Sequence, residues 1–194
     1  MHLSLSARVG LDEPTADDGF ITWFDAEVVD EDGESVAARA SAALIHVGSA
    51  GEALYDAMDA DSCQLEGLWT TYLMADRPDD ERGEDSLYSR LQGDMGHCLL
   101  YVHELHVEPA FLAMNLAFAV LRRLADVVGE SAAVVVARAE DPVQAETLRL
   151  LGFEPGPQPF WHLRQVLLQP TVRRGDDGRF EVATLPPRMR FMNN

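Results

Sequence analysis

Apolar and polar residues alternate in the first part of the chain, which is the pattern of half-buried β-strands. The alternation covers residues 3–9, 21–29 and 35–47. Gly33 lies in the Asp-Glu-Asp-Gly turn between the last two segments and can adopt positive φ. We therefore predict a strand followed by a β-hairpin. Two helices should follow, one after a cap at Ser49 and one over Cys63–Met74, weakened by Gly67.

Strand and helix patterns then succeed each other to residue 168. Strands are predicted at 98–107, 132–139 and 160–168, and helices at about 111–128 and 142–151, with a short helix at about 86–92 before them. Asp141 before Pro142 is typical of a helix cap and a first-turn proline, and Gly152 is typical of a helix C-cap. These helix ends are the most sharply marked in the sequence.

Strands followed by a strand–helix–strand–helix–strand series predict an α/β fold. We expect a central mixed sheet of six or seven strands with helices on both faces. Residues 1–169 form one domain in this interpretation, and 170–194 form an arginine-containing C-terminal extension. Within the extension, Arg179–Leu185 should form a hairpin across Arg-Arg-Gly-Asp-Asp-Gly. The extension is expected to be solvated or to contribute to a homodimer contact.

Charge narrows the range of partners. The chain has 33 acidic and 15 basic residues, a formal net charge of −18, and all of its basic residues are arginine. Such a surface should repel nucleic acid and anionic membranes and attract cationic amines, although adaptation to salt produces the same composition. No apolar run is long enough to span a membrane, and the N-terminal residues do not resemble a signal peptide. Cys63 and Cys98 lack metal or redox spacing, so we expect a reduced cytoplasmic protein.

Two motifs carry a family resemblance. The first is LHVEPAFLAMNLAFAVLRRL at 105–124, a strand ending in Val-x-Pro before a long helix, and the second is VQAETLRLLGFEP at 143–155. With the order strand, Val-x-Pro, helix, strand, helix, Gly-Phe, strand, residues 98–168 resemble the GCN5-related N-acetyltransferase (GNAT) family. The resemblance implies a GNAT-like fold and an acyl-CoA co-substrate, acetyl-CoA or another. The N-terminal half departs from it, since its hairpin precedes the helices.

The resemblance also implies where acyl-CoA would bind. In the family, the bare N-terminus of the long helix receives the pyrophosphate, and the end of the preceding strand pairs with the pantetheine arm. The matching positions are Leu105, His106, Val107, Leu112, Ala113, Met114, Asn115, Leu116 and Ala117. Leu112 stands where the family has Arg or Gln, and Asn115 stands where it has its first Gly; Ala117 conforms. Leu148 replaces the tyrosine that often protonates the leaving thiolate.

The strand before the Val-x-Pro turn supplies the candidate catalytic residues. Alternation places Tyr101, His103, Leu105 and Val107 on one face and Val102, Glu104 and His106 on the other. By resemblance, His103 is the candidate general base and Tyr101 a supporting or acid residue. No metal site is predicted, because His103 and His106 should project from opposite faces.

These residues predict an N-acyltransferase that moves an acyl group from acyl-CoA to a small-molecule or peptidic cationic amine. A catalytically silent GNAT-fold protein that binds a ligand or a protein is the alternative, favoured by the departures at Leu112, Asn115 and Leu148. A third interpretation uses an acyl-carrier protein as donor.

Overall fold

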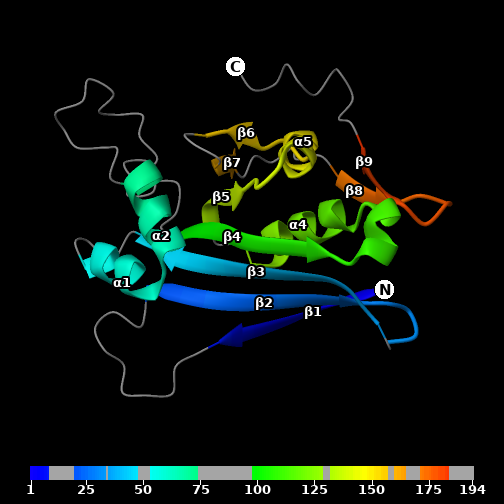
Figure 1. Cartoon of the computed structure of the whole chain (residues 1–194), viewed down its shortest axis with the longest axis horizontal. Coiled ribbons are helices and arrows are strands. Elements are labelled where there is room, and N and C mark those ends of the chain that lie inside the picture. The colour runs from blue at the N-terminus through cyan, green and yellow to red at the C-terminus, as the bar shows by residue number, and fades with distance from the viewer. Residues whose placement is uncertain are drawn as a thin grey trace.

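A seven-stranded mixed sheet forms the centre of the structure (Figure 1), which is a computed structural model. It describes residues 1–8, 20–33, 35–47, 53–73, 98–128, 132–156, 160–164 and 171–183. The strands of the sheet are β1 (His2–Arg8), β2 (Ile21–Val29), β3 (Val36–His46), β4 (Cys98–Val107), β5 (Ala132–Arg138), β6 (Glu154–Pro155) and β7 (Phe160–Arg164). Their order across the sheet is β1-β2-β3-β4-β5-β7-β6.

The pairing of the strands makes the sheet mixed. β1 to β4 form an antiparallel meander, β4 and β5 are parallel, and β7 is antiparallel to both β5 and β6. The predicted mixed sheet of six or seven strands is therefore confirmed. From β4 onward, the elements follow the GNAT-like order that the second half of the sequence predicts. The predicted N-terminal hairpin also precedes the helices, since β2 and β3 come before the first helix.

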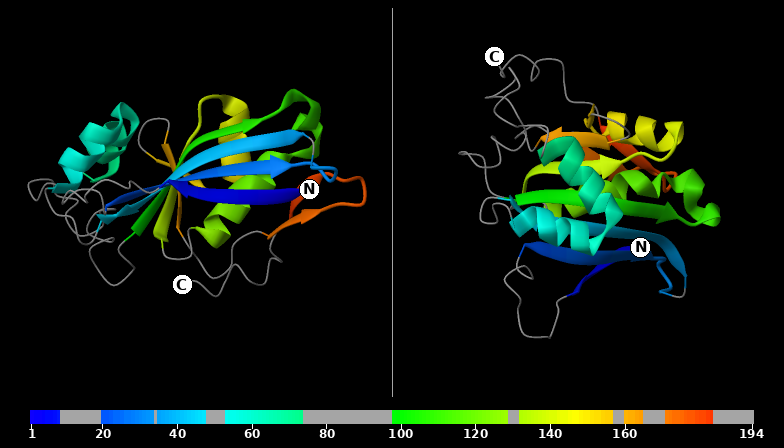
Figure 2. Two further views of the ribbon diagram at one scale, coloured as in Figure 1. Left: turned by 90° about the horizontal axis from the view of Figure 1, so that it is seen from below. Right: turned by 60° about the vertical axis from the view of Figure 1, so that its left-hand side comes forward.

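Helices cover both faces of the sheet, as predicted. α1 (Ala53–Asp61) and α2 (Cys63–Leu68) pack on one face, and α4 (Leu116–Val127) and α5 (Pro142–Leu150) pack on the other. The alternation in β4 divides the core accordingly: Leu99 and Tyr101 face α1 and α2, whereas Leu100 and Val102 face α4 and α5. Figure 2 shows α1 and α2 gathered at one end of the sheet, so they cover only part of their face.

The structure closely matches the helix predicted at 142–151, whereas it divides the helix predicted from Cys63 into two elements. Asp141 caps α5 as expected, accepting hydrogen bonds from the backbone N–H groups of Val143 and Gln144 at 2.8 Å each, and Gly152 has φ 89° at its end. The helix predicted from Cys63 is α2 followed by the π-helix η2 (Trp69–Leu73). The predicted cap at Ser49, the helix at 86–92 and the strand residues 165–168 lie outside the described residues.

The C-terminal extension contains the predicted hairpin. β8 (Thr171–Arg174) and β9 (Phe180–Ala183) pair antiparallel, and Gly178 has φ 83° in the turn between them. Figure 1 shows the hairpin beside α4, and Val172 and Phe180 pack against the core that α4 covers. Residues 171–183 therefore form part of the packed structure.

Candidate functional site

The candidate site lies around His103, which is the extra residue of a β-bulge in β4. Ser41 of β3 pairs with Glu104 and the next residue, Ala42, pairs with Val102, so His103 is an extra residue on β4. A bulge of this kind reverses the alternation of side chains beyond it. Leu105 joins the core on the α4 side, opposite Tyr101.

The predicted sharing of faces along β4 is therefore wrong beyond His103. Tyr101 does not share a face with Leu105 and Val107, and Glu104 and His106 lie on the face opposite Val102. The alternation rule failed because it assumes one β4 residue for each β3 residue. The bulge also brings His103 and His106 to the same surface. The prediction of no metal site assumed that these two side chains project from opposite faces, and that assumption is wrong.

Beyond the bulge, β4 and β5 separate. Their parallel pairing ends at Val102 and Ala137, while β4 continues to Val107 and the chain leaves β5 for α5. Residues 103–107 of β4 therefore have no β5 partner on that edge. The gap opens into a cavity of about 340 Å³, here called the cleft. It is lined by β4, the start of α4, the end of β5 and the first turns of α5.

The chain between β4 and α4 differs from the predicted helix. Pro109–Met114 form a 3₁₀ helix, η3, and α4 begins at Leu116, so the predicted start near Phe111 is wrong. Asn115 separates the two helices with φ 56° and ψ 37°, a left-handed conformation that Gly and Asn tolerate best. At the position where the resemblance predicts a glycine, Asn115 adopts the left-handed conformation, which asparagine tolerates best after glycine.

The side chain of Asn115 is held away from the start of α4. Its Nδ2 donates a hydrogen bond to the Phe180 carbonyl oxygen of β9 at 3.2 Å, and it makes no capping bond to α4. The first turn of α4 therefore has no side-chain cap from this residue, and the N-terminal end of a helix dipole attracts negative charge.

The predicted cofactor residues lie in different surroundings. Those that line the cleft are Leu105, His106, Val107, Leu112 and Ala117. Leu112 is 60% exposed, whereas Leu116 is 1% exposed and faces the core. Met114 packs against that core, Ala113 is exposed, and Asn115 binds the hairpin. The cleft also contains Leu148, the residue at the family's tyrosine position.

A larger cavity, here called the trough, lies on the other face of the sheet. Its volume is about 1,050 Å³, and it runs across β1 to β4 where α1 and α2 leave the sheet uncovered. Its ionisable side chains are the carboxylates of Asp25, Glu27, Asp61 and Glu104, the guanidinium of Arg39, and the imidazoles of His103 and His106. The acidic excess makes the trough attractive to cations.

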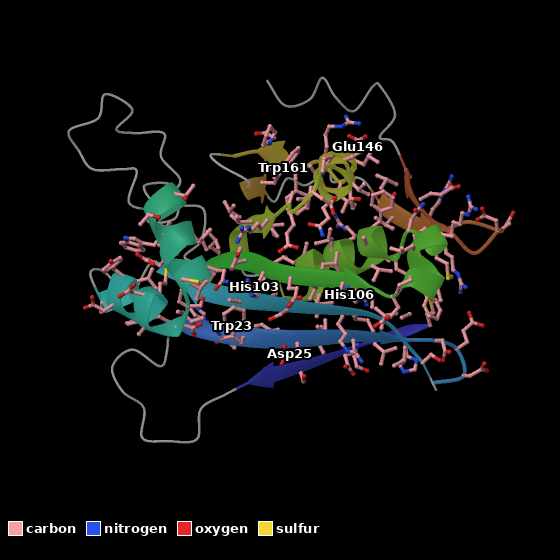
Figure 3. All side chains as sticks on the ribbon, viewed as in Figure 1. Trp23, Asp25, His103, His106, Glu146 and Trp161 are labelled. Atoms are coloured by element: carbon pink, nitrogen blue, oxygen red, sulfur yellow. The ribbon has the colours of Figure 1, made fainter. Side chains whose placement is uncertain are left out.

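Hydrogen bonds fix several of these side chains. Trp23 Nε1 donates to Asp61 Oδ2 at 3.0 Å, which ties the end of α1 to β2. Arg39 donates to Glu27 at 3.2 Å and to Glu108 at 3.4 Å. Figure 3 shows Trp23 and Asp25 on β2 near His103 and His106 on β4.

His103 is positioned between the two cavities and lines both of them. Its ring lies edge-on to Trp23, with the centroids 5.7 Å apart, and 5.8 Å from the ring of Tyr101. Its Nδ1 atom is buried and has no hydrogen-bond partner among the described residues. Buried polar atoms without a partner are rare in folded proteins, and this one belongs to a residue that lines both cavities.

Tyr101 occupies a different environment from the one expected of an acid in contact with substrate. The side chain is fully buried and lines neither the cleft nor the trough. Burial raises the pKa of its hydroxyl to about 12. The phenol therefore stays protonated at neutral pH, and its ring supports His103 from within the core.

The trough residues of β2 and β3 were missing from the predicted site, although the sequence contains their signal. Trp23, Asp25 and Glu27 alternate with the core residues Phe24, Ala26 and Val28. Alternation showed that these side chains share a face. Only the structure shows that this face adjoins His103.

Neither a metal cluster nor a membrane-spanning helix is found within the described residues. Among them, no group of three or more His, Cys, Asp or Glu side chains is arranged to hold a metal ion. None of the helices within the described ranges is long and apolar enough to cross a membrane.

Comparisons with known proteins give a limited result. No family model matches the sequence, and no curated protein matches it. Among solved structures, a polyamine N-acetyltransferase from Drosophila melanogaster that catalyses the formation of N-acetylagmatine is similar at 17% identity, with a TM-score of 0.44. The match covers 79% of this chain and 83% of that one.

Proposed function

We propose that the protein is an N-acyltransferase that uses acetyl-CoA or another acyl-CoA as donor and a cationic amine as acceptor. One observation carries the proposal: His103, at the bulge of β4, lines both the cleft and the trough, together with Glu104 and His106 of the same strand. A donor in the cleft and an acceptor in the trough would meet at this imidazole.

The cleft supports the donor side of the proposal. An antiparallel edge strand presents alternate N–H and C=O groups on its unpaired side, and residues 103–107 present such an edge to the cleft. A pantetheine arm carries two amides that pair with an edge of this kind. Ala117 at the start of α4 also lines the cleft, so the pyrophosphate would lie at the positive end of the helix dipole.

The trough supports the acceptor side. Carboxylates from three different elements, Asp25, Asp61 and Glu104, line it, and they favour a cationic amine over an anionic or neutral acceptor. The volume of about 1,050 Å³ leaves room for a small molecule or the side chain of a peptide.

In the proposed reaction, His103 removes a proton from the acceptor ammonium, directly or through water. The amine lone pair attacks the thioester carbonyl carbon and forms the new C–N bond. The intermediate loses its second N–H proton to water and collapses with cleavage of the C–S bond, and the protonated His103 returns its proton to the thiolate. The products are an amide and CoA with a free thiol. Tyr101 supports the ring of His103 and takes no direct part.

The alternative is a silent GNAT-fold protein that binds a ligand. Leu112 and Leu148 favour it, because both present apolar side chains to the cleft where the family pattern has polar ones. The acidic residues Glu140 and Asp141 also line the cleft. A silent protein would retain the cavities without turnover.

Thermal unfolding with and without acyl-CoA tests the proposal. Ligand at 100 times its dissociation constant should add about 2.7 kcal/mol to the free energy of unfolding. No shift with acetyl-CoA or longer acyl-CoAs would favour the silent alternative.

Turnover by variants then tests the role of His103. A general base contributes about 10²–10⁴-fold, so His103→Ala should lower kcat by that factor and keep the acyl-CoA shift. His106→Ala is the matched control, since it removes a second imidazole from the same cavities, and its kcat should fall far less. Undiminished turnover in His103→Ala would remove this residue from the mechanism. Because the chain contains no lysine, self-acylation of lysine side chains contributes no background.

A further inference from the structure

A third cavity lies on the side of α4 opposite the cleft. Its volume is about 360 Å³, and we call it the hairpin cavity because β8 and β9 form one of its walls. Ala117 and Leu121 of α4 face the cleft, whereas Leu116, Ala119 and Val120 face the hairpin cavity. One helix thus separates two cavities, and the proposed acyltransfer does not use the second.

The walls of the hairpin cavity are apolar. They come from β1, β2, α4 and the hairpin, and include Leu3, Val28, Leu116, Val120, Val172 and Phe180. Its size is near the lower end of the range of ligand pockets, about 300–1,000 Å³. The walls are suited to the apolar body of a small ligand.

The polar residues of the hairpin cavity are mainly basic, in contrast to the chain as a whole. Arg122, Arg123 and His2 line it together with one carboxylate, Asp126. Asp126 already forms an ion pair with Arg122. The Arg122 Nε atom donates a hydrogen bond to Asp126 Oδ2 at 3.1 Å, and a second Arg122 nitrogen contacts Oδ1. Arg123, in contrast to Arg122, has no ion pair within the described part of the chain.

Arg123 lies where it can complete an amphipathic site. It follows Leu116 by seven residues and Ala119 by four, so the three share one face of α4. A guanidinium at the edge of an apolar cavity binds the carboxylate of a ligand whose tail enters the cavity. We infer that the hairpin cavity is a binding site for an amphipathic carboxylate with a short apolar tail, such as a medium-chain fatty acid.

Titration calorimetry with octanoate, below its micelle concentration, tests the inference. Octanoate should bind at one site, and octanol and octylamine should bind at least about tenfold more weakly, because a charge-assisted hydrogen bond is lost. Arg123→Gln should lower octanoate affinity to the level of octanol, and Arg123→Lys should retain part of it. Arg149→Gln, an exposed arginine on α5, is the matched control and should bind as the wild type does.

Two variants of α4 locate the site. Ala119→Phe fills the hairpin cavity and should abolish octanoate binding, whereas Ala117→Phe fills the cleft and should leave it unchanged. Because a bulky residue can impair folding, methyl NMR of the wild type gives an independent measurement. Octanoate should shift the signals of Val120 and Val172 and leave that of Val143 in the cleft unmoved.

Several outcomes would overturn the inference. They are the absence of saturable octanoate binding, equal binding of octylamine, full binding by Arg123→Gln, and shifts confined to the cleft. If inorganic phosphate competes with octanoate and binds with equal affinity, the site is an anion site without a role for the apolar walls. None of these results depends on whether the cleft binds acyl-CoA, so the two proposals fail separately.

Discussion

Replacement of Asn115 tests the link between the departure from the family motif and the geometry of the site. Asn115 has φ 56°, and its Nδ2 donates to the Phe180 carbonyl at 3.2 Å. In Asn115→Ala the hydrogen bond is lost, at about 1 kcal/mol, and a Cβ without polar compensation must adopt the left-handed region, at about 1 kcal/mol more. We expect the free energy of unfolding to fall by about 2 kcal/mol.

The same site offers two matched comparisons. Asn115→Gly loses the bond but relieves the backbone, so it should cost about 1 kcal/mol less than Asn115→Ala. Asn115→Asp keeps tolerance of the left-handed region and loses the donor, so it should lie close to the glycine variant. Urea unfolding followed by circular dichroism gives the three values. If Asn115→Ala unfolds with the same free energy as Asn115→Gly, the left-handed conformation does not determine which residue is tolerated here, and the reasoning fails.

Three further predictions concern other parts of the structure. Asp141→Ala removes the cap of α5 and should lower the free energy of unfolding by about 1 kcal/mol in urea titrations; no change would mean that the cap is redundant. Because burial raises the pKa of Tyr101 to about 12, above the value of about 10 in the unfolded chain, its stabilising effect is complete below pH 10 and is lost as pH rises through 12. The free energy of unfolding should therefore fall more in the wild type than in Tyr101→Phe over this interval, and equal falls would contradict the assigned burial. Cys98 is buried, which raises the pKa of its thiol, so iodoacetamide should modify the exposed Cys63 first, as peptide mass spectrometry would show.

The strands and helix ends that the sequence predicted well are those with strong local signals. Asp141 and Pro142 mark the start of α5 within the chain itself, and Gly152 marks its end. The alternation in β2 and β3 likewise reflects which face is buried. Such features depend on neighbours in sequence, so they could be predicted without the fold.

The features that were missed depend on contacts between distant segments. The bulge at His103 follows from the register of β4 against β3, and no glycine marks it. The η3 helix and the late start of α4 depend on Asn115, whose side chain is held by β9, 65 residues further along the chain. Because the bulge decides which side chains meet His103, the trough could not be assigned from the sequence.

Two family departures gain a physical explanation from the structure. Asn115 has positive φ, which asparagine tolerates, at the position where the resemblance predicts a glycine, and its side chain points to β9 instead of crowding the start of α4. Leu148 lines the cleft at the position where the resemblance predicts a proton-donating tyrosine, and the proposed return of the proton from His103 removes the need for that tyrosine. Leu112 has no such explanation in the structure.

Calorimetric titration of acetyl-CoA into two variants of α4 tests the central claim most directly. Ala117 lines the cleft and Ala119 lines the hairpin cavity, two residues apart on the same helix. If the cleft between β4 and β5 holds the donor, Ala117→Phe abolishes acetyl-CoA binding, and Ala119→Phe binds it as the wild type does. Wild-type affinity in a folded Ala117→Phe variant would contradict the claim.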